Sequence, residues 1–177
     1  MQNIIIEKPY KFRPPCRGTI WSSLIQHCNL FTRFLRRKEG VVDHEVRHLD
    51  RLLKSLQAGH GILITPNHSR NADPLVMGWI TKAAKCHVYA MASWHLFNQD
   101  WFTSWAIHKM GGFSVYREGI DRQAINMAVD ILNTAERPLV IFPEGEVYHC
   151  NDRVTPFREG ASAIAFTAAK RAERPIV

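Results

Sequence analysis

Residues 61–92 read GILITPNHSRNADPLVMGWITKAAKCHVYAMA, and this stretch decides the fold class. The apolar run at 61–67 is short and predicts a buried strand, and residues 86–92 predict a second strand of the same kind. Between them, residues 74–85 carry a longer apolar pattern that predicts a helix. A strand, a helix and a strand in succession predict two parallel strands joined by a crossover helix.

The same alternation continues to the end of the chain. We expect further helices at 100–111, 120–135 and 158–172, and further strands at 112–117, 138–145 and 174–177. The sequence therefore predicts an α/β fold with a largely parallel central sheet flanked by helices. The last strand begins at Pro175 and stops after three residues, so we expect the domain to be incomplete at its C-terminus.

Residues 1–40 form a basic, amphipathic N-terminal segment ahead of the α/β domain, which we place at 41–177. Within this segment, residues 19–38 have apolar side chains at three- and four-residue steps and predict a helix with a basic last turn. Such a stripe fits an anionic membrane surface and packing on the domain equally well. A second amphipathic helix is predicted at 44–58, ended by Gly59.

The composition narrows the class of protein. The chain has 177 residues, 46% of them hydrophobic, and a net charge of +7, which indicates one folded domain with a basic excess. That excess fits nucleic acid, an anionic membrane surface or phosphorylated small molecules. No unbroken apolar stretch reaches the roughly 18 to 20 residues of a membrane-spanning helix, and the N-terminus lacks the pattern of a signal peptide.

The junction between the strand at 61–67 and the next helix carries a possible acid–base pair. Asp73 followed by Pro74 is a typical helix start, and His68 lies just before it. The loop at 69–72 can fold back and place the Asp73 carboxylate on one imidazole nitrogen, which leaves the other nitrogen as a base. Alternatively, Asp73 is only a helix cap and His68 a solvent-exposed loop residue, which an isolated H-x-x-x-x-D pattern favours.

Two other strand ends carry polar groups that suit a ligand. Arg117 follows a strand, where its guanidinium can hold a phosphate with two hydrogen bonds; alternatively, it pairs on the surface with Glu118 or Asp121. Glu144 lies in a tight turn, and Gly145 lets backbone amides approach a ligand closely. A single Glu in a turn is more often simply exposed, so neither segment decides a function alone.

Taken in order, NHSRNAD (67–73), GFSVYR (112–117), FPEG (142–145) and RPIV (174–177) resemble the four blocks of the glycerol-phosphate and 1-acylglycerol-3-phosphate (lysophosphatidic acid) acyltransferase family. The resemblance covers about residues 40–177, and its most specific parts are H-x-x-x-x-D and FPEG. It implies transfer of a fatty acyl group from acyl-CoA or acyl-carrier protein to the hydroxyl of a glycerolipid such as lysophosphatidate. The family works in phospholipid biosynthesis at membranes, without metal or another cofactor.

The resemblance also implies a role for individual residues. His68 is expected to be the general base and Asp73 its orienting carboxylate. The residues expected to bind substrate are Arg117, Glu144, Gly145 and Asn67. We further expect a cytoplasmic protein that lies peripherally at the inner face of the membrane.

The sequence departs from the family after FPEG, where Thr or Ser and then Arg are usual. Glu146 and Val147 stand there instead, and an acidic group beside a phosphate site repels phosphate. Arg153 and Arg158 are the candidates to replace the missing Arg. A lipid acceptor other than lysophosphatidate is therefore an alternative, as is an inactive lipid- or membrane-binding module. Nucleic-acid binding rests on charge alone, because no motif for it is present.

Aromatic side chains are frequent between these blocks. We expect most of them to lie in the core, and the alternative is a lipid-facing or acyl-channel role. They are Trp94, Phe97, Trp101, Phe102 and Trp105.

Overall fold

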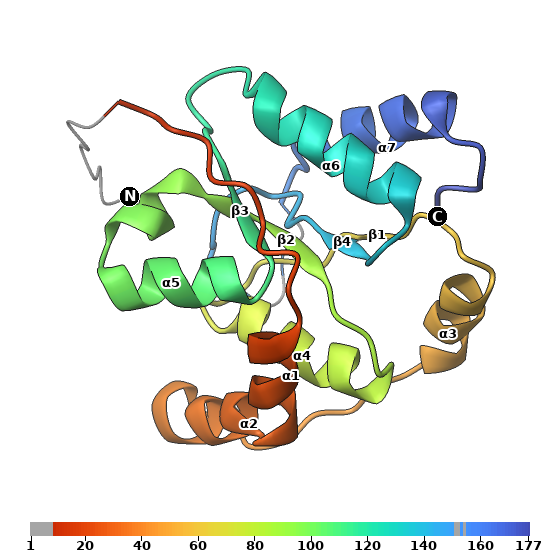
Figure 1. Cartoon of the computed structure of the whole chain (residues 1–177). Helices are drawn as coiled ribbons and strands as arrows, with labels where there is room; N and C mark the ends of the chain where they lie inside the picture. The colour runs from red at the N-terminus through yellow and green to blue at the C-terminus, as the bar shows by residue number, and fades with distance from the viewer. Residues whose placement is uncertain (1–8, 151–152, 154) are drawn as a thin grey trace.

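The computed structural model describes residues 9–150, 153 and 155–177. Its centre is a four-stranded sheet with the strand order β1-β4-β2-β3, in which every neighbouring pair is parallel (Figure 1). The strands are β1 (Leu63–Ile64), β2 (Tyr89–Ser93), β3 (Gly112–Val115) and β4 (Leu139–Val140). The predicted α/β fold with a parallel sheet is therefore confirmed.

The C-terminal residues add a further parallel partner beside β1. Gly61 and Ile176 form a parallel bridge. The Leu63 amide donates to the Val177 carbonyl at 2.8 Å, and the Val177 amide donates to the Gly61 carbonyl at 2.9 Å. The strand predicted at 174–177 thus begins at the outer edge of β1.

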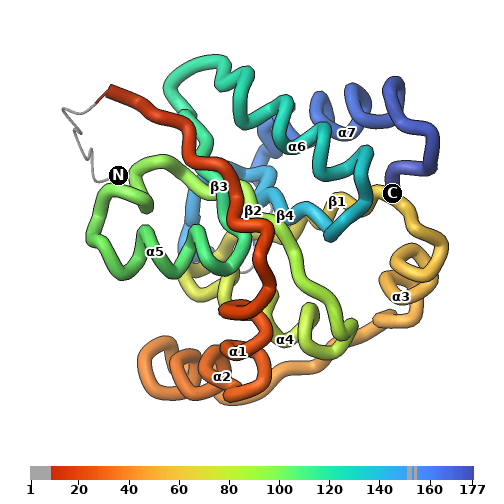
Figure 2. The backbone as a smooth tube through the Cα atoms, in the orientation of Figure 1, coloured from red at the N-terminus to blue at the C-terminus, as the bar shows by residue number. Residues whose placement is uncertain are grey.

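Helices cover both faces of the sheet (Figures 1 and 2). The main ones are α4 (Asp73–Ala83), α5 (Trp101–Lys109), α6 (Arg122–Thr134) and α7 (Gly160–Arg171), with a 3₁₀ turn η2 (Trp94–Asn98) before α5. The chain moves from β1 to β2 to β3 in one direction and then returns to β4. Because parallel crossovers are right-handed, this reversal places α6 and α7 on the face opposite α4 and α5.

The main core fills the space between the sheet and the pair α6 and α7. Phe113, Leu132 and Leu139 are completely buried there, with Ala128 and Ala168 at the helix contacts. Burying each large side chain stabilises the fold by about 1.5–3 kcal/mol relative to leaving it in water. This core fixes the C-terminal ends of the strands, where the loops of interest begin.

The helix predicted at 19–38 is two helices, α1 (Ile20–His27) and α2 (Leu30–Phe34), followed by a π-helical turn η1 (Leu35–Glu39). The break is at Asn29, whose φ of 53° is left-handed. Asparagine tolerates this conformation better than most residues. The prediction of a single helix was therefore wrong.

Side-chain contacts fasten this helical segment to α4. The Trp79 Nε1 atom donates to the Thr32 hydroxyl at 2.8 Å, and the Phe31 ring packs so closely on Gly78 that a Cβ there would lie 2.5 Å from it. Leu35 is fully buried. One face of the segment therefore packs on the domain. The part of the predicted basic segment at 1–8 lies outside the described residues.

The helix predicted at 44–58 begins later than expected, as α3 (Leu49–Gln57). His48 just before it has a left-handed φ of 55°, so α3 does not extend back to residue 44.

The N-terminal segment around Arg13 runs along β3. The Ser114 amide donates to the Arg13 carbonyl at 3.0 Å, so this segment covers an otherwise open strand edge.

Candidate active site

Two loops meet where the strand order reverses. The loop after β1 leads to α4 on one face of the sheet, whereas the loop after the neighbouring strand β4 leads to α7 on the other face. In open α/β sheets, ligands bind at such points beside the carboxyl ends of the strands. Hydrogen bonds join the two loops here, because the His68 amide donates to Glu144 Oε1 at 3.2 Å and the Tyr148 amide donates to the His68 carbonyl at 3.3 Å.

The first loop brings His68 and Asp73 together as the sequence predicts. Asp73 Oδ2 lies 3.2 Å from His68 Nδ1 and also accepts the Arg70 amide at 2.8 Å. The loop thus folds back onto the first residue of α4, where Pro74 follows without a lost hydrogen bond. The two side chains are 16% and 24% exposed, so the pair is sheltered yet reachable.

The imidazole of His68 is held in place from both sides. Its Nδ1 faces Asp73, and its ring lies against Phe142, with ring centroids 4.2 Å apart and an angle of 30° between the planes. Among the described residues, none forms a hydrogen bond with His68 Nε2. This nitrogen is therefore free to take a proton from a bound molecule. Phe142 was not among the expected site residues, because it reads as the end of a buried strand.

Glu144 lies beneath the loop that carries His68. It is 4% exposed, and its Oε1 accepts the His68 amide. In this position the carboxylate holds the backbone of the candidate base. Whether it also touches an acceptor stays a prediction.

Two guanidinium groups flank Gly145. Arg117 donates from Nη1 to the Gly145 carbonyl, and the Arg158 side chain lies over the Gly145 Cα, where an added Cβ would be 2.7 Å from Nε. Gly145 has a φ of 72°, which favours glycine. The Arg158 amide donates to the Pro143 carbonyl at 2.8 Å, so both cations are positioned by the FPEG turn itself.

The alternative partners of Arg117 are engaged elsewhere. Asp121 caps α6 by accepting the Ala124 amide at 3.0 Å, and its other oxygen accepts the Tyr116 amide at 3.0 Å. Glu118 accepts the Tyr116 hydroxyl at 2.8 Å. Within the described part of the chain, neither carboxylate forms an ion pair with Arg117. The Arg117 side chain is exposed, and its hydrogen bond goes to the Gly145 carbonyl.

A family comparison decides what kind of domain carries this site. The family model described as Acyltransferase matches residues 45–177, which is more than half of the chain. The chain belongs to the acyltransferase family. The resemblance that the four sequence blocks indicated is thereby confirmed.

One relative of this acyltransferase domain is a bacterial protein. A 1-acyl-sn-glycerol-3-phosphate acyltransferase of Streptococcus pneumoniae strain R6 is 34% identical over 110 residues. The matched region is 62% of this chain and 38% of the relative. The chain thus spans well under half the length of that protein.

Two other residues that the sequence singles out for the acyltransferase site lie at the surface. Asn67 is exposed on the loop before His68, and Arg153 is exposed after the FPEG turn. Of the two candidates for the missing arginine, the structure places Arg158 beside Gly145. Its guanidinium also pairs with Glu146, at 3.1 Å between Nη2 and Oε1. The sequence singles out Arg158 and Glu146 separately, and only the structure shows that they are in contact.

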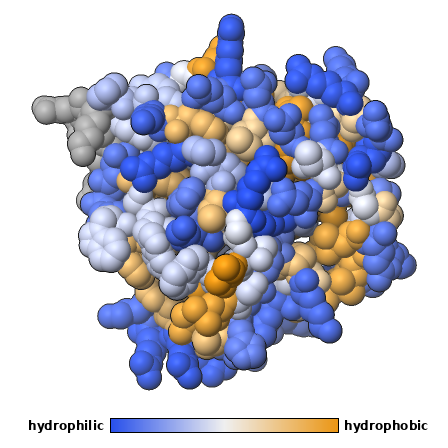
Figure 3. Space-filling view, in the orientation of Figure 1, coloured by the Kyte–Doolittle hydropathy of each residue, from blue (hydrophilic) through white to orange (hydrophobic). Residues whose placement is uncertain are grey.

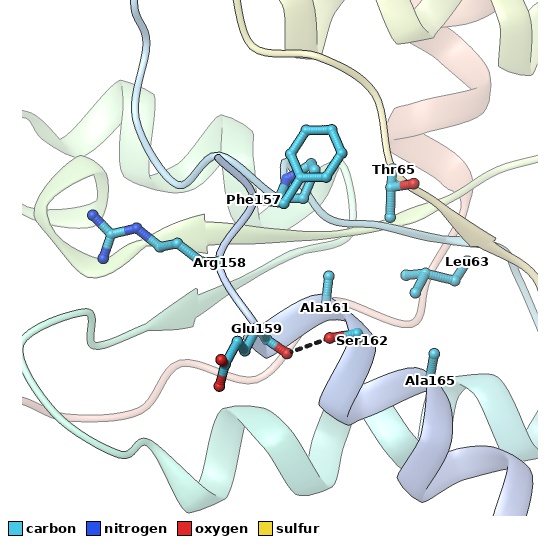
Figure 4. Close-up of a pocket in the computed structure, with 9 residues that line it drawn as sticks. Leu63, Thr65, Phe157, Arg158, Glu159, Ala161, Ser162 and Ala165 are labelled. Carbon is cyan, nitrogen blue, oxygen red and sulfur yellow. Dashed lines mark hydrogen bonds between the residues drawn. The ribbon is translucent and has the colours of Figure 1, made fainter. Parts of the chain in front are cut away.

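A pocket of about 360 Å³ adjoins the FPEG turn on the side of α7 (Figure 4). Its walls are mostly apolar, with Leu63, Ala161 and Ala165 on one side and Phe157 on the other. Pro143 and Arg158 belong both to this pocket and to the FPEG region. The pocket therefore adjoins the FPEG turn, whereas His68 and Asp73 are not among the residues that line it.

The expected aromatic residues divide between core and surface. Trp94 and Phe97 are 6% and 2% exposed, whereas Trp101 and Phe102 are 79% and 58% exposed. Trp105 packs edge-on against Trp21 of α1, with centroids 4.9 Å apart. The expectation of core packing thus holds for the first two residues only.

Residues 9–150, 153 and 155–177 contain neither a cluster of potential metal ligands nor a membrane-spanning helix. No three His, Cys, Asp or Glu side chains gather there as metal ligands. None of the helices in this part is both long enough and apolar enough to cross a bilayer. The expectation that the domain needs no metal or other cofactor stays a prediction.

Proposed function

We propose that this domain transfers a fatty acyl group from a thioester, acyl-CoA or acyl-carrier protein, to the hydroxyl of a glycerolipid. The observation that supports it most is the His68–Asp73 contact of 3.2 Å at the reversal of strand order. Membership of the acyltransferase family supports it independently. The named activity of the Streptococcus pneumoniae relative suggests a lysophospholipid-type acceptor.

In the proposed mechanism, Asp73 holds the proton of His68 on Nδ1, so that Nε2 is the basic nitrogen. Nε2 takes the proton of the acceptor hydroxyl while its oxygen attacks the thioester carbonyl carbon. The carbon–sulfur bond then breaks, and the thiolate takes a proton from the imidazolium. The products are an ester and a free thiol. A positioned base of this kind contributes about 100- to 10,000-fold to the rate.

The charged groups around Gly145 are the proposed site for the acceptor's headgroup. Arg117 and Arg158 both lie beside this residue, and guanidinium groups bind phosphate with paired hydrogen bonds. Glu144 links this turn to the base through the His68 amide. The phosphate and the reacting hydroxyl of a glycerolipid are separated only by the glycerol carbons. In this proposal one acceptor molecule therefore contacts the two arginines with its phosphate and His68 with its hydroxyl.

The apolar pocket beside α7 is the proposed site for the acyl chain (Figure 4). Its apolar walls suit a hydrocarbon chain, which gains about 0.8 kcal/mol for each buried methylene. It adjoins Pro143, next to the buried Glu144. In this proposal the acyl chain leaves the pocket past Pro143, so that its carbonyl carbon reaches His68.

We also propose that the domain lies on a membrane surface through α1, α2 and α5. Apolar side chains gather over α1 in the space-filling view (Figure 3), where Ile20 is 79% and Leu24 47% exposed. Trp101 and Phe102 of α5 are also exposed. Basic side chains follow nearby in the sequence, at Arg33, Arg36, Arg37 and Lys38. Aromatic and basic side chains together favour an anionic lipid interface.

The experiment is a transfer assay with radiolabelled acyl-CoA or acyl-carrier protein and a panel of lysolipids, comparing the wild type with His68→Ala. Label in a diacyl product with the wild type, lost in the variant, is the expected result. His27→Ala, at an exposed position of α1, is the matched control and should keep the activity. No transfer from either donor, with liposome binding retained, would instead favour the inactive membrane-binding module.

A further inference from the structure

The rim of the candidate site carries charges of both signs within one turn. Arg117 and Arg158 flank Gly145, and the next residue, Glu146, places its Oε1 3.1 Å from Arg158 Nη2. The side chains of Arg158 and Glu146 are 55% and 28% exposed. A ligand that binds at Gly145 therefore meets a carboxylate as well as two guanidinium groups.

This arrangement is a poor match for a phosphate monoester. A monoester carries about −1.5 to −2 charges at pH 7, and binding here brings that charge against Glu146 as well as the arginines. Like charges placed together disfavour a ligand and serve to exclude it. A phosphodiester carries a single negative charge, which one guanidinium can bind through paired hydrogen bonds. The carboxylate then remains available for a cation on the same ligand.

We propose that the acceptor is a lysophospholipid whose phosphodiester carries a primary ammonium, as in a phosphoethanolamine headgroup. This inference rests on the proposed function. Arg117 and Arg158 bind the phosphate, and Glu146 binds the ammonium. In the part of the chain that the structure describes, the Glu146 Oε2 atom accepts no hydrogen bond, so it can receive an ammonium N–H while Oε1 stays near Arg158.

The position of Glu146 relative to the base supports this assignment. Glu144 holds the His68 amide, and Glu146 is two residues further along the same turn. The turn at 144–146 therefore links the proposed headgroup site to the loop that carries His68. The ion pair with Arg158 also keeps the Glu146 carboxylate directed at the phosphate-binding side of Gly145.

The test compares kcat/KM for four lysolipids with the same acyl chain and different headgroups: phosphoethanolamine, phosphocholine, phosphoglycerol and the phosphate monoester. The phosphoglycerol headgroup shares the diester but has no cation. We expect the wild type to prefer phosphoethanolamine over phosphoglycerol by about tenfold, which corresponds to about 1.4 kcal/mol. Phosphocholine, a cation without N–H groups, should lie between them, and the monoester should be the poorest.

The Glu146→Gln variant should lose the preference for phosphoethanolamine over phosphoglycerol. Glu173→Gln, an exposed change beyond the far end of α7, should keep it. Because each ratio is measured on one protein preparation, partial unfolding cancels. Transfer with an unchanged ratio in Glu146→Gln, or a wild-type preference for the monoester, would overturn this inference and leave the proposed function intact. No transfer to any acceptor would overturn both.

Discussion

The Nδ1 atom of His68 lies 3.2 Å from the Oδ2 atom of Asp73, although Asp73 is five positions further along the sequence. On a continuous helix this spacing would place the two side chains on different faces. The loop avoids this because the Arg70 amide donates to the same Asp73 oxygen at 2.8 Å and turns the chain back. The carboxylate thus orients both the imidazole and the loop that carries it.

Replacing Asp73 with Asn should slow acyl transfer by about 100- to 10,000-fold, the range of a positioned acid–base group. The amide keeps the size of the side chain but no longer stabilises the imidazolium or fixes the proton on Nδ1. Steady-state kcat is the measurement, with the thermal unfolding midpoint as a check on folding. Asp50→Asn, exposed on α3, is the control and should keep full activity. A kcat for Asp73→Asn within twofold of the wild type would contradict the assigned role.

Replacing Gly145 with Ala should raise the KM for the lipid acceptor. The new Cβ would lie 2.7 Å from Arg158 Nε, so the guanidinium has to move. Gly40→Ala is a matched control, since its φ of 67° is similar but a Cβ there meets nothing within 4 Å. Both variants should lose about 1–3 kcal/mol of stability through backbone strain. Only Gly145→Ala should change KM, and an equal KM in the two variants would exclude a role of this contact in acceptor binding.

The main elements follow from the sequence because each strand is a short apolar run between two helical patterns. The convergence of His68 and Glu144 follows as well, since parallel strands end at one edge of the sheet. The break at Asn29 does not follow, because apolar residues continue at helical steps through Leu24, Cys28 and Phe31. There the contacts with α4 select two short helices over one long helix.

The detail of the site was less predictable than its location. Arg158 and Glu146 are in contact although they are twelve positions apart in the sequence, and no periodicity in the sequence predicts that contact. The sequence predicts Phe142 as part of a strand, yet its ring packs against His68. The role of Asp121 as the cap of α6 was also missed. It follows a strand by six residues, so nothing in its spacing separates a cap from a partner of Arg117.

Filling the pocket beside α7 should shorten the acyl chains that the enzyme accepts. Ala165 lines this pocket, and Ala165→Trp should reduce kcat/KM for long-chain donors by tenfold or more while changing short-chain donors little; loss of a few buried methylenes at about 0.8 kcal/mol each accounts for this size. Ala163→Trp, on the exposed side of α7, is the control. A parallel loss for short and long chains in Ala165→Trp would place the acyl chain elsewhere.

Mild acid should destabilise the fold through His87. Burial lowers the pKa of His87 below its ordinary value of 6.5, and the Arg137 guanidinium lowers it further. The fold favours the neutral imidazole of His87. The contribution of this imidazole to the free energy of unfolding is therefore complete above about pH 6.5 and is lost as the pH falls below that value. The free energy of unfolding in urea should therefore decrease less between pH 7 and pH 5 for His87→Asn than for the wild type. His27→Asn should retain the wild-type decrease, and equal decreases in all three proteins would contradict this prediction.

The central claim is that His68 and Asp73 act as one unit, and a double-mutant comparison tests it most directly. The measurement is kcat for acyl transfer by His68→Ala, Asp73→Asn and the variant that carries both changes. If the carboxylate acts only through the imidazole, the double variant should be no slower than His68→Ala alone, because residues that act as a unit are strongly non-additive. A double variant slower by the product of the two single effects would show that the residues act independently and would contradict this account.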